Sequence, residues 1–321
     1  METHAIIFGI KGLKLNLNEI NFFKKYKPWG IILFSRNINN LYQVRNLTNS
    51  IRDIFKDRNF PILVDQEGGR VNRFKKIINL DKYTAKHFGD IFKNKKIFYK
   101  DFNKFLKANV SILKYCGINI NTVPVLDLFD KDKKSVIGNR SFSRDPEIVK
   151  KLSQYLTKFY NYFGVETVIK HIPGHGCTNV DSHFRLPRVK FSLDYLKKND
   201  FKPFKNNSAN LAMTAHILYE KLDSNKCATQ SRYIIQDIVR KYLNFKGIVM
   251  SDDLSMKALS ASLVVKARLS LDAGCNLLLH CNGKIDEMKK LSLIVPQIDN
   301  FTYKITKKIK TNFNKFNSRI S

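Results

Sequence analysis

The stretch "ETVIKHIPGHG", residues 166–176, carries the pattern on which the fold prediction rests. A short apolar run ends in a lysine and a histidine, and a Pro-Gly turn signal follows at once. Continuous apolarity over so few residues is typical of a strand that is buried on both faces of a parallel sheet. The segment therefore predicts one such strand over 166–171.

Seven similar runs occur along the chain: "AIIFGI" (5–10), "GIILFS" (30–35), "PILVD" (61–65), "INTVPVLD" (120–127), "NLAMTAH" (210–216), "GIVMSD" (247–252) and "CNLLLHC" (275–281). Most intervals between them are long enough for a helix. In "DPEIVKKLSQYLTKFYNYFG" (145–164), Asp145 can cap the helix, Pro146 can occupy its first turn and Gly164 can end it.

This alternation predicts an α/β fold, and eight strand-helix units favour a closed (β/α)8 TIM barrel. We expect one catalytic domain over 1–300, followed by a basic helix or tail over 301–321. An open, doubly wound sheet is the alternative.

The composition is strongly basic, with 57 Lys and Arg against 27 Asp and Glu and a formal charge of +30. Such a charge raises the hypothesis of a non-catalytic polyanion-binding protein. The basic residues are spread along the whole length, as in "FKNKKIFYKDFNKF" (92–105), so we expect solvated surface lysines and no specific nucleic-acid partner.

Five cysteines without a CxxC spacing indicate reduced thiols in a long chain that needs no disulfides. The first residues lack a basic segment before their apolar run, and nowhere do 18 apolar residues follow one another. We therefore expect a cytoplasmic protein without a membrane span. A monomer is compatible with the sequence.

Polar residues end several of the predicted strands, which in a TIM barrel is where catalytic side chains lie. They are Asp65, Asp127, His171, His216 and Asp252. The spacing of His171 and His175 resembles the i, i+4 pair of zinc sites, but the intervening Pro-Gly pair breaks the helix that such a pair requires. A metal-dependent hydrolase using His171, His216 and Asp252 stays open as an alternative.

Two further patterns point to proton transfer and to a carboxylate that acts as a nucleophile, a metal ligand or a general base. In "NVDSH" (179–183), Asp181 and His183 are two residues apart, so on extended backbone they project to the same side, and a carboxylate supports an imidazole that transfers protons near neutral pH. In "MSDDLSM" (250–256), we assign the chemistry to Asp252, and we expect Asp253 to cap a helix through "LSMKAL" (254–259).

The "VDQEGGRVNRF" stretch (64–74) lacks the spacings of nucleotide-binding loops, so no cofactor is expected. There Asp65 can accept hydrogen bonds from sugar hydroxyls and Arg73 can donate, as can Arg140 in "IGNRSFSRDP" (137–146).

Taken together, "LVDQEGGRVNRF", "GNRSF", "KHIPGHG" with "DSH", "MTAHI" and "SDDLSM" resemble the bacterial β-N-acetylglucosaminidases of glycoside hydrolase family 3, in the single-domain form that acts in cell-wall recycling. The resemblance covers most of the chain. It implies release of terminal β-GlcNAc from 1,6-anhydro-muropeptides, with no metal or other cofactor.

The resemblance also implies residue roles. Asp252 would be the nucleophile, and His183, paired with Asp181, the general acid/base. Sugar-binding positions would be Asp65, Arg73, Arg140, Lys170 and His171, whereas His175 would order its loop. A retaining mechanism through a covalent glycosyl-enzyme on Asp252 follows from these roles. The alternative is attack by the substrate's own acetamido group, assisted by Asp252 and Asp253.

Overall fold

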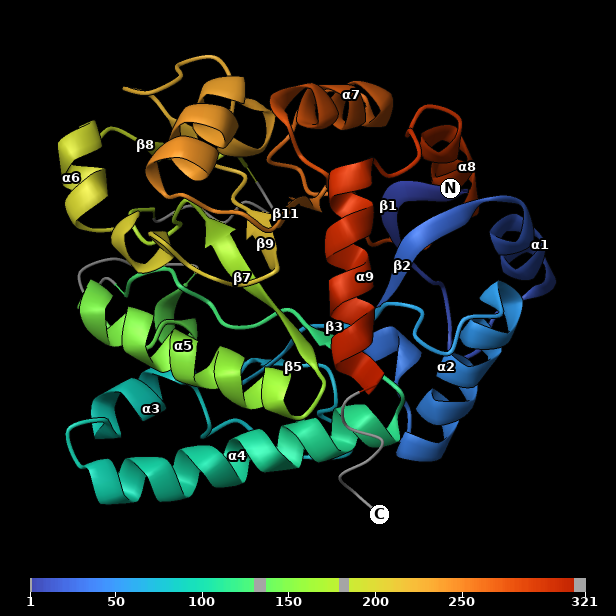
Figure 1. Ribbon diagram of the computed structural model, residues 1–321, viewed down its shortest axis with the longest axis horizontal. Helices are drawn as coiled ribbons and strands as arrows, with labels where there is room; N and C mark the ends of the chain where they lie inside the picture. Colours follow the sequence, from blue (N-terminus) through green and yellow to red (C-terminus); the bar gives the residue numbers. More distant parts are fainter. Residues whose placement is uncertain (1, 130–136, 179–184, 315–321) are drawn as a thin grey trace.

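A closed barrel of eight parallel strands forms the centre of the protein, which is described by a computed structural model over residues 2–129, 137–178 and 185–314 (Figure 1). Around the ring the strands follow one another in chain order. They are β1 (Thr3–Gly9), β2 (Lys27–Leu33), β3 (Ile62–Val64), β6 (Ile120–Asn121), β7 (Glu166–Ile172), β9 (Leu211–Thr214), β11 (Ile248–Asp253) and β12 (Leu277–His280). Each predicted run overlaps one of these strands, which confirms the TIM barrel.

Helices surround the barrel and form its outer layer (Figure 1). Among the described residues the α-helices are α1 (Leu17–Lys25), α2 (Leu41–Phe55), α3 (Ala85–Ile91), α4 (Lys95–Tyr115), α5 (Pro146–Tyr162), α6 (Leu193–Lys198), α7 (Leu263–Ala273), α8 (Ile285–Ser292) and α9 (Asn300–Asn314). Between β9 and β11 the connection is the π-helix η5 (Ile234–Tyr242). Short 3-10 turns are η1 (Ser35–Asn37), η2 (Gly138–Arg140), η3 (Lys202–Phe204) and η4 (Ala228–Gln230).

Local signals set the ends of α5 as the sequence predicts. The Asp145 carboxylate accepts a hydrogen bond from the backbone N–H of Glu147 (2.8 Å), and Pro146 occupies the first turn. Past the end of the helix, Gly164 takes a φ of +69°, a conformation that favours glycine. The chain then turns directly into β7.

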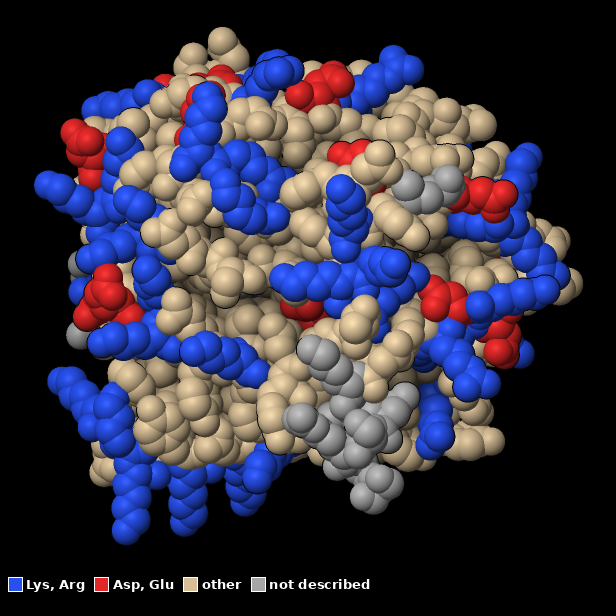
Figure 2. All heavy atoms as spheres, viewed as in Figure 1, with Lys and Arg blue, Asp and Glu red and all other residues tan. Residues whose placement is uncertain are grey.

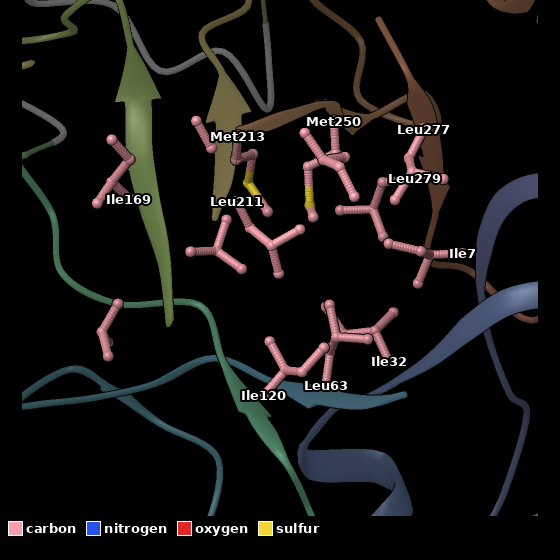
Figure 3. Close-up of a cluster of buried hydrophobic side chains, with 14 of the residues drawn as sticks. Ile7, Ile32, Leu63, Ile120, Ile169, Leu211, Met213, Met250, Leu277 and Leu279 are labelled. Carbon is pink, nitrogen blue, oxygen red and sulfur yellow. The ribbon is translucent and has the colours of Figure 1, made fainter. Parts of the chain in front are cut away.

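Apolar side chains fill the inside of the barrel, so it is a packed core and not a channel (Figure 3). In the close-up, every barrel strand except β11 contributes a labelled Ile or Leu. Met213 of β9 and Met250 of the neighbouring β11 complete the filling. The labelled residues are Ile7, Ile32, Leu63, Ile120, Ile169, Leu211, Met213, Met250, Leu277 and Leu279, all at most 3% exposed.

The strand predicted over 120–127 is much shorter in the structure. Regular pairing ends after Asn121, and beyond it a single bridge joins Val125 to Lys170. Pro124 has no N–H to donate to a ladder, so the proline interrupts the strand. Asp127 therefore lies on irregular backbone beyond the strand that it was predicted to end.

Two small sheets lie outside the barrel. The antiparallel pair β4 (Gln66–Gly68) and β5 (Val71–Asn72) directly follows β3, and the parallel pair β8 (Arg188–Val189) and β10 (Leu218–Tyr219) joins two loops that follow β7 and β9. Both sheets order connections that start at the carboxyl ends of barrel strands.

Helix α9 lies across the opposite end of the barrel, where the strands begin, and crosses in front of them in Figure 1. Trp29, near the start of β2, donates to the Thr306 hydroxyl (2.8 Å), and Lys310 pairs with Asp57 before β3. The predicted basic tail is thus helical up to Asn314, with the last residues outside the described part. The domain boundary at residue 300 stays a prediction.

The same face shows how the positive charge is distributed. Figure 2 shows Lys and Arg side chains spread over it, with Asp and Glu scattered among them. No single basic stripe stands out there, as expected for solvated lysines. All five cysteines carry free thiols. No helix in the described ranges combines the length and apolarity that crossing a bilayer demands.

The buried bond between α9 and β2 gives a stability prediction. Replacing Thr306 by Val keeps the shape but leaves the Trp29 N–H unpaired, which should cost about 1–3 kcal/mol. Thermal unfolding should show a lower midpoint, while activity below that temperature is unchanged because α9 lies at the far end from the strand carboxyl ends. Thr311→Val, the same change at an exposed position of α9, is the control and should leave the midpoint unchanged. Equal midpoints for both variants would contradict the role of the Thr306 bond.

Candidate active site

A cavity of about 240 Å³ opens where the barrel strands end. Its polar lining comes mainly from three strands and the segments that follow them. The lining residues are Ile32, Phe34, Asp65, Glu67, Val71, Arg73, Ile137, Arg140, Lys170, His171, His175, Met213, Asp252, Asp253, Met256, Leu279 and Cys281. Charged groups of both signs therefore meet at the rim that the TIM barrel uses for catalysis.

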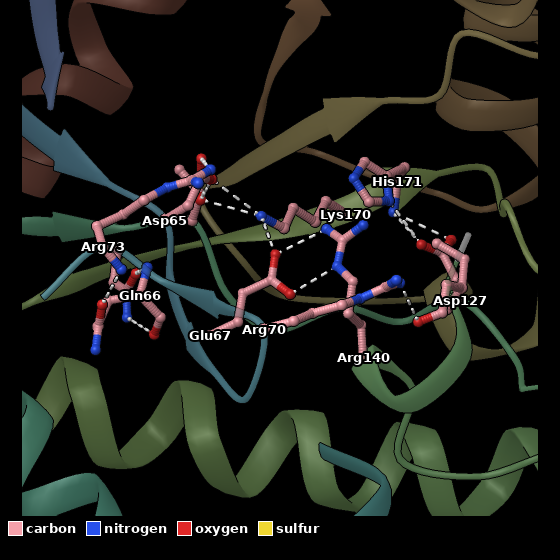
Figure 4. Close-up of polar contacts among 12 residues, drawn as sticks. Asp65, Gln66, Glu67, Arg70, Arg73, Asp127, Arg140, Lys170 and His171 are labelled. Carbon is pink, nitrogen blue, oxygen red and sulfur yellow. Dashed lines mark hydrogen bonds and ion pairs between the residues drawn. The ribbon is translucent and has the colours of Figure 1, made fainter. Parts of the chain in front are cut away.

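Lys170 of β7 is the centre of an ion-pair network (Figure 4). Its Nζ lies 2.7 Å from Glu67 Oε1 and 3.1 Å from Asp65 Oδ1. Arg140 of η2 donates two parallel hydrogen bonds to Glu67, from Nε and from one terminal nitrogen, both of 2.8 Å. Arg73, just after β5, donates to Asp65 Oδ2 (2.8 Å), and the Thr122 hydroxyl donates to Oδ1. Such forked, charge-assisted bonds hold planar groups in a defined orientation.

The network keeps both acids ionised although they are buried. Burial acts to raise the pKa of Asp65, but the charges of Lys170 and Arg73 hold that pKa well below its ordinary value. Burial likewise opposes ionisation of Glu67, yet Arg140 and Lys170 lower its pKa to about 2. Both carboxylates therefore act as hydrogen-bond acceptors whose charge is already compensated.

Asp127 organises the two histidines of the cavity wall. Its carboxylate accepts from His171 Nδ1 (2.6 Å), from the His171 backbone N–H (3.2 Å) and from the His175 backbone N–H (2.7 Å). Burial disfavours its charge, but His171 and these hydrogen bonds lower the pKa of Asp127 below its ordinary value. Because Nδ1 of His171 donates to Asp127, its other nitrogen is left for the cavity that it lines.

His175 is neutral near pH 7, since burial lowers its pKa to about 4. Its Nδ1 lies 3.2 Å from the Thr178 hydroxyl, and its ring centroid is 5.6 Å from that of His171. The family resemblance implies an ordering role for this residue. The structure agrees in part, because its backbone is fastened to Asp127, but its side chain also lines the cavity.

Asp252 lies near the carboxyl end of β11, above the apolar side chains that fill the barrel. Met250 pairs with Met213, and Met213 with Lys170, so β7, β9 and β11 reach the same height. Asp252 lies two residues beyond Met250, where the pairing of β11 with β12 is irregular between Met250 and Asp253. Met250 fills the barrel interior (Figure 3), and the Asp252 side chain lines the cavity.

The Asp252 carboxylate is only partly committed. Its Oδ1 accepts from the backbone N–H of Asp253 (2.7 Å), and within the described ranges no other hydrogen bond reaches it. Burial would raise the pKa of Asp252, but the fields of His216, His171 and Lys170 hold it below its ordinary value. Burial also lowers the pKa of His216.

The helix-capping role predicted for Asp253 is wrong. Residues 254–259 form turns and not a helix, and α7 begins only at Leu263. The Asp253 carboxylate instead accepts from the backbone N–H of Ser255 (3.0 Å), from its hydroxyl (2.5 Å) and from the Cys281 backbone N–H (3.1 Å). It thereby ties the loop after β11 to the end of β12.

His216 does not offer a nitrogen to the cavity. Its Nδ1 lies 2.8 Å from the Thr229 hydroxyl and its Nε2 3.2 Å from the Asp253 carbonyl oxygen, to which it must donate. Both ring nitrogens are therefore occupied, which removes His216 from the metal-ligand set considered above. Over the described ranges no three His, Cys, Asp or Glu side chains converge in a metal-binding arrangement.

The structure brings six of the predicted site residues to one cavity: Asp65, Arg73, Arg140, Lys170, His171 and Asp252. Asp181 and His183 lie outside the described residues. Sequence reasoning missed Glu67, although it follows Asp65 by two positions in "DQEGG". It also noted Asp127 as a strand end without giving it a role. The i, i+2 spacing from a strand-end aspartate was the available signal for Glu67.

Comparisons with known proteins agree with this geometry. Residues 6–310 match the Glycosyl hydrolase family 3 N terminal domain. The β-hexosaminidase of Shewanella frigidimarina is 36% identical over 292 residues, which cover 87% of this chain and 82% of that protein. The β-hexosaminidase of Neisseria gonorrhoeae is 37% identical over 273 residues, covering 81% and 73%.

Among solved structures, NagZ from Neisseria gonorrhoeae in complex with N-trifluoroacetyl-D-glucosamine is similar with a TM-score of 0.86 and 32% sequence identity, over 96% of this chain and 90% of that one. The barrel, the charged cavity and the match over nearly the whole length lead to one conclusion. The chain is a glycoside hydrolase and belongs to glycosyl hydrolase family 3.

Proposed function

We propose that the protein is a retaining exo-β-N-acetylglucosaminidase that releases terminal β-GlcNAc, with 1,6-anhydro-muropeptides of peptidoglycan recycling as its substrates. The similar proteins named β-hexosaminidase support the reaction. The similar NagZ structure with N-trifluoroacetyl-D-glucosamine supports the sugar. A cavity of about 240 Å³ suits one sugar ring, since it lies below the range of about 300–1,000 Å³ that holds larger ligands.

One observation carries the assignment of the nucleophile. Of the four acidic residues of the described cavity lining, Asp65 and Glu67 are neutralised by Lys170 and the two arginines, and Asp253 is held by Ser255 and Cys281. Asp252 accepts one hydrogen bond, from a backbone N–H, within the described ranges. An ionised carboxylate with an uncommitted oxygen is what attack on an anomeric carbon requires.

The remaining charged groups can bind the sugar. Asp65 accepts hydrogen bonds from hydroxyl groups, while Arg140, Lys170 and His171 donate to hydroxyl or carbonyl oxygens. Because Glu67 and Asp127 fix these donors, little conformational entropy is lost on binding.

The reaction then proceeds in two steps. His183 protonates the leaving oxygen while Asp252 forms a covalent bond to the anomeric carbon, and His183 then takes a proton from the water that releases the sugar. Asp181 supports the imidazolium that forms in the first step. His183 follows the cavity-lining His175 by eight residues in the sequence.

A role of Asp253 in assisting the substrate's acetamido group is disfavoured. Its two oxygens already accept from Ser255 and from the Cys281 backbone. Freeing them would leave these donors unpaired near β12, at a cost of about 1–3 kcal/mol each.

The first test concerns Asp252. Asp252→Asn should abolish release of 4-nitrophenol from its β-GlcNAc glycoside, because the amide is not a nucleophile. With a 2-fluoro glycoside, mass spectrometry of the wild type should find the label on Asp252. Asp272→Asn, the same change at an exposed position of α7, is the matched control and should retain full activity. Wild-type turnover by the Asp252 variant would refute the proposal.

The second test separates the two histidine roles. His183→Ala should lower kcat by about 10²–10⁴-fold, and azide should restore turnover because it needs no general base. His171→Ala should mainly raise KM, since it removes a sugar donor. An azide-rescued loss in the His171 variant, with His183→Ala unaffected, would assign proton transfer to the Asp127–His171 pair instead.

The third test concerns the charge network and its pH dependence. Glu67→Gln leaves Lys170 and Arg140 undercompensated, so the free energy of unfolding at pH 7 should fall by about 3–5 kcal/mol. The pKa of Glu67 is lowered to about 2 on folding, so its contribution is present above its unfolded pKa of about 4.3 and is lost as pH falls toward 2.

Urea denaturation at several pH values measures this effect. The gap between wild type and the Glu67 variant should narrow below about pH 4.3. Glu2→Gln removes a carboxylate from an exposed ion pair with Lys27 and should leave stability almost unchanged. A gap that stays constant from pH 7 down to about pH 2 would show that the charge of Glu67 is not what stabilises the fold.

A further inference from the structure

A buried carboxylate lies behind the cavity wall and has no place in the chemistry above. Asp200, between α6 and η3, is 2% exposed and is not part of the cavity lining. It touches the turn of residues 174–177, which follows β7. A Cβ added to Gly174 would meet the Asp200 Cβ at 2.8 Å, and one added to Gly176 would meet Asp200 Oδ1 at 2.9 Å and the Leu128 carbonyl oxygen at 2.8 Å. The turn is thus clamped between Leu128 and Asp200.

Polar contacts fasten the same turn. The Cys177 thiol donates to Asp200 Oδ2 at 2.6 Å, and the Tyr219 hydroxyl donates to the carbonyl oxygen of Gly174. On the cavity side, the backbone N–H of His175 donates to Asp127 (2.7 Å). Two buried carboxylates therefore hold the turn, Asp127 from the front and Asp200 from behind.

Burying Asp200 to hold the turn costs free energy of folding. Its Oδ1 has no hydrogen-bond partner among the described residues. Burial raises the pKa of Asp200 to about 6; the Cys177 thiol opposes this rise and the charge of Asp127 adds to it. Among the residues that the structure describes, the ionisable groups that face it are Cys177, Asp127 and Tyr219, none of them a cation.

The sign of this effect matters. A carboxyl whose pKa is raised on folding stabilises the fold while it is protonated, and that contribution is lost as pH rises through about 6. At neutral pH the ionised Asp200 is therefore a cost to stability. A side chain that costs stability and contacts a site loop is expected where function requires it.

We propose that Asp200 is a positioning residue, which fixes the turn 174–177 through Cys177. It thereby sets the place of His175 in the cavity wall and the point from which the chain runs on to His183. The inference rests on the proposed function, because it assigns the acid/base to the segment that follows Cys177. His183 follows Cys177 by six positions, so an error in the anchor carries through to the reacting group.

Asp200→Asn tests the proposal, since it keeps the shape, removes the charge and replaces the carboxylate acceptor of the Cys177 thiol with a neutral, weaker amide oxygen. On the nitrophenyl β-GlcNAc glycoside, kcat should fall by about 10- to 100-fold. KM should stay within about twofold, because Asp200 does not contact the sugar. Amide hydrogen exchange in residues 172–178 should become faster, while the unfolding midpoint at pH 7.5 should not fall. Asp194→Asn, an exposed position of α6, is the matched control and should behave as wild type.

The cysteine gives a second, independent pair of variants. Cys177→Ser retains an O–H donor for Asp200 and should keep kcat within about threefold. Cys177→Ala removes the donor and should lower kcat as Asp200→Asn does. The double variant Asp200→Asn with Cys177→Ala should be no worse than either single one, because both remove the same contact.

Wild-type kcat in Asp200→Asn would overturn the proposal, as would a loss of kcat without faster exchange in residues 172–178. If Asp200→Asn does not fold, the Cys177 pair decides, and equal activity of the Ser and Ala variants counts against the anchor. A wild-type enzyme that does not cleave the GlcNAc glycoside refutes the proposed function instead. In that case the exchange measurement still tests whether Asp200 holds the turn.

Discussion

The site depends on the compensation of buried charge around Lys170. An ammonium group that is almost fully buried is tolerable only when anions surround it, and Asp65 and Glu67 lie at 3.1 and 2.7 Å. Those anions need further cations, which Arg73 and Arg140 supply (Figure 4). One lysine on β7 therefore fixes the segment after β3, the β4-β5 sheet and the η2 turn. Breaking any one of these pairs leaves a charge stranded in the cavity wall.

This compensation also gives the carboxylates of the site different roles. Asp65, Glu67 and Asp127 give their oxygens to cations or to backbone N–H groups, so they orient and do not react. Asp253 ties a loop to the Cys281 backbone. Asp252 receives the fields of His216, His171 and Lys170 without a direct ion pair, which keeps it ionised yet available. Chemically identical side chains thus differ in function because their neighbours differ.

The sequence predicted those features that depend on local pattern. Apolar runs located all eight barrel strands, and strand-end polarity located Asp65, His171 and Asp252 at one rim, whereas Lys170 was proposed only from the family resemblance. Features that depend on partners distant in the chain were not predicted. The role of Glu67 arises from Arg140, which is 73 positions away, and Asp253 binds a backbone N–H 28 positions away, although its local sequence predicted a cap. Proline, a local signal overlooked at position 124, explains why β6 stops early. The pairing of Asp181 with His183 stays a prediction.

The turn after β7 bears on how a rigid barrel could support the proposed acid/base. Strand β7 ends at Ile172, and the proposed mechanism requires the chain beyond it to deliver His183 to the cavity. A turn held by the barrel side alone, through Asp127, would be free to pivot about that contact. Asp200 adds a second contact on the opposite side, and two separated contacts fix an orientation where one fixes only a position. The energetic disadvantage of burying that carboxylate is offset if the gain is alignment, because catalysis responds steeply to displacements of about 1 Å.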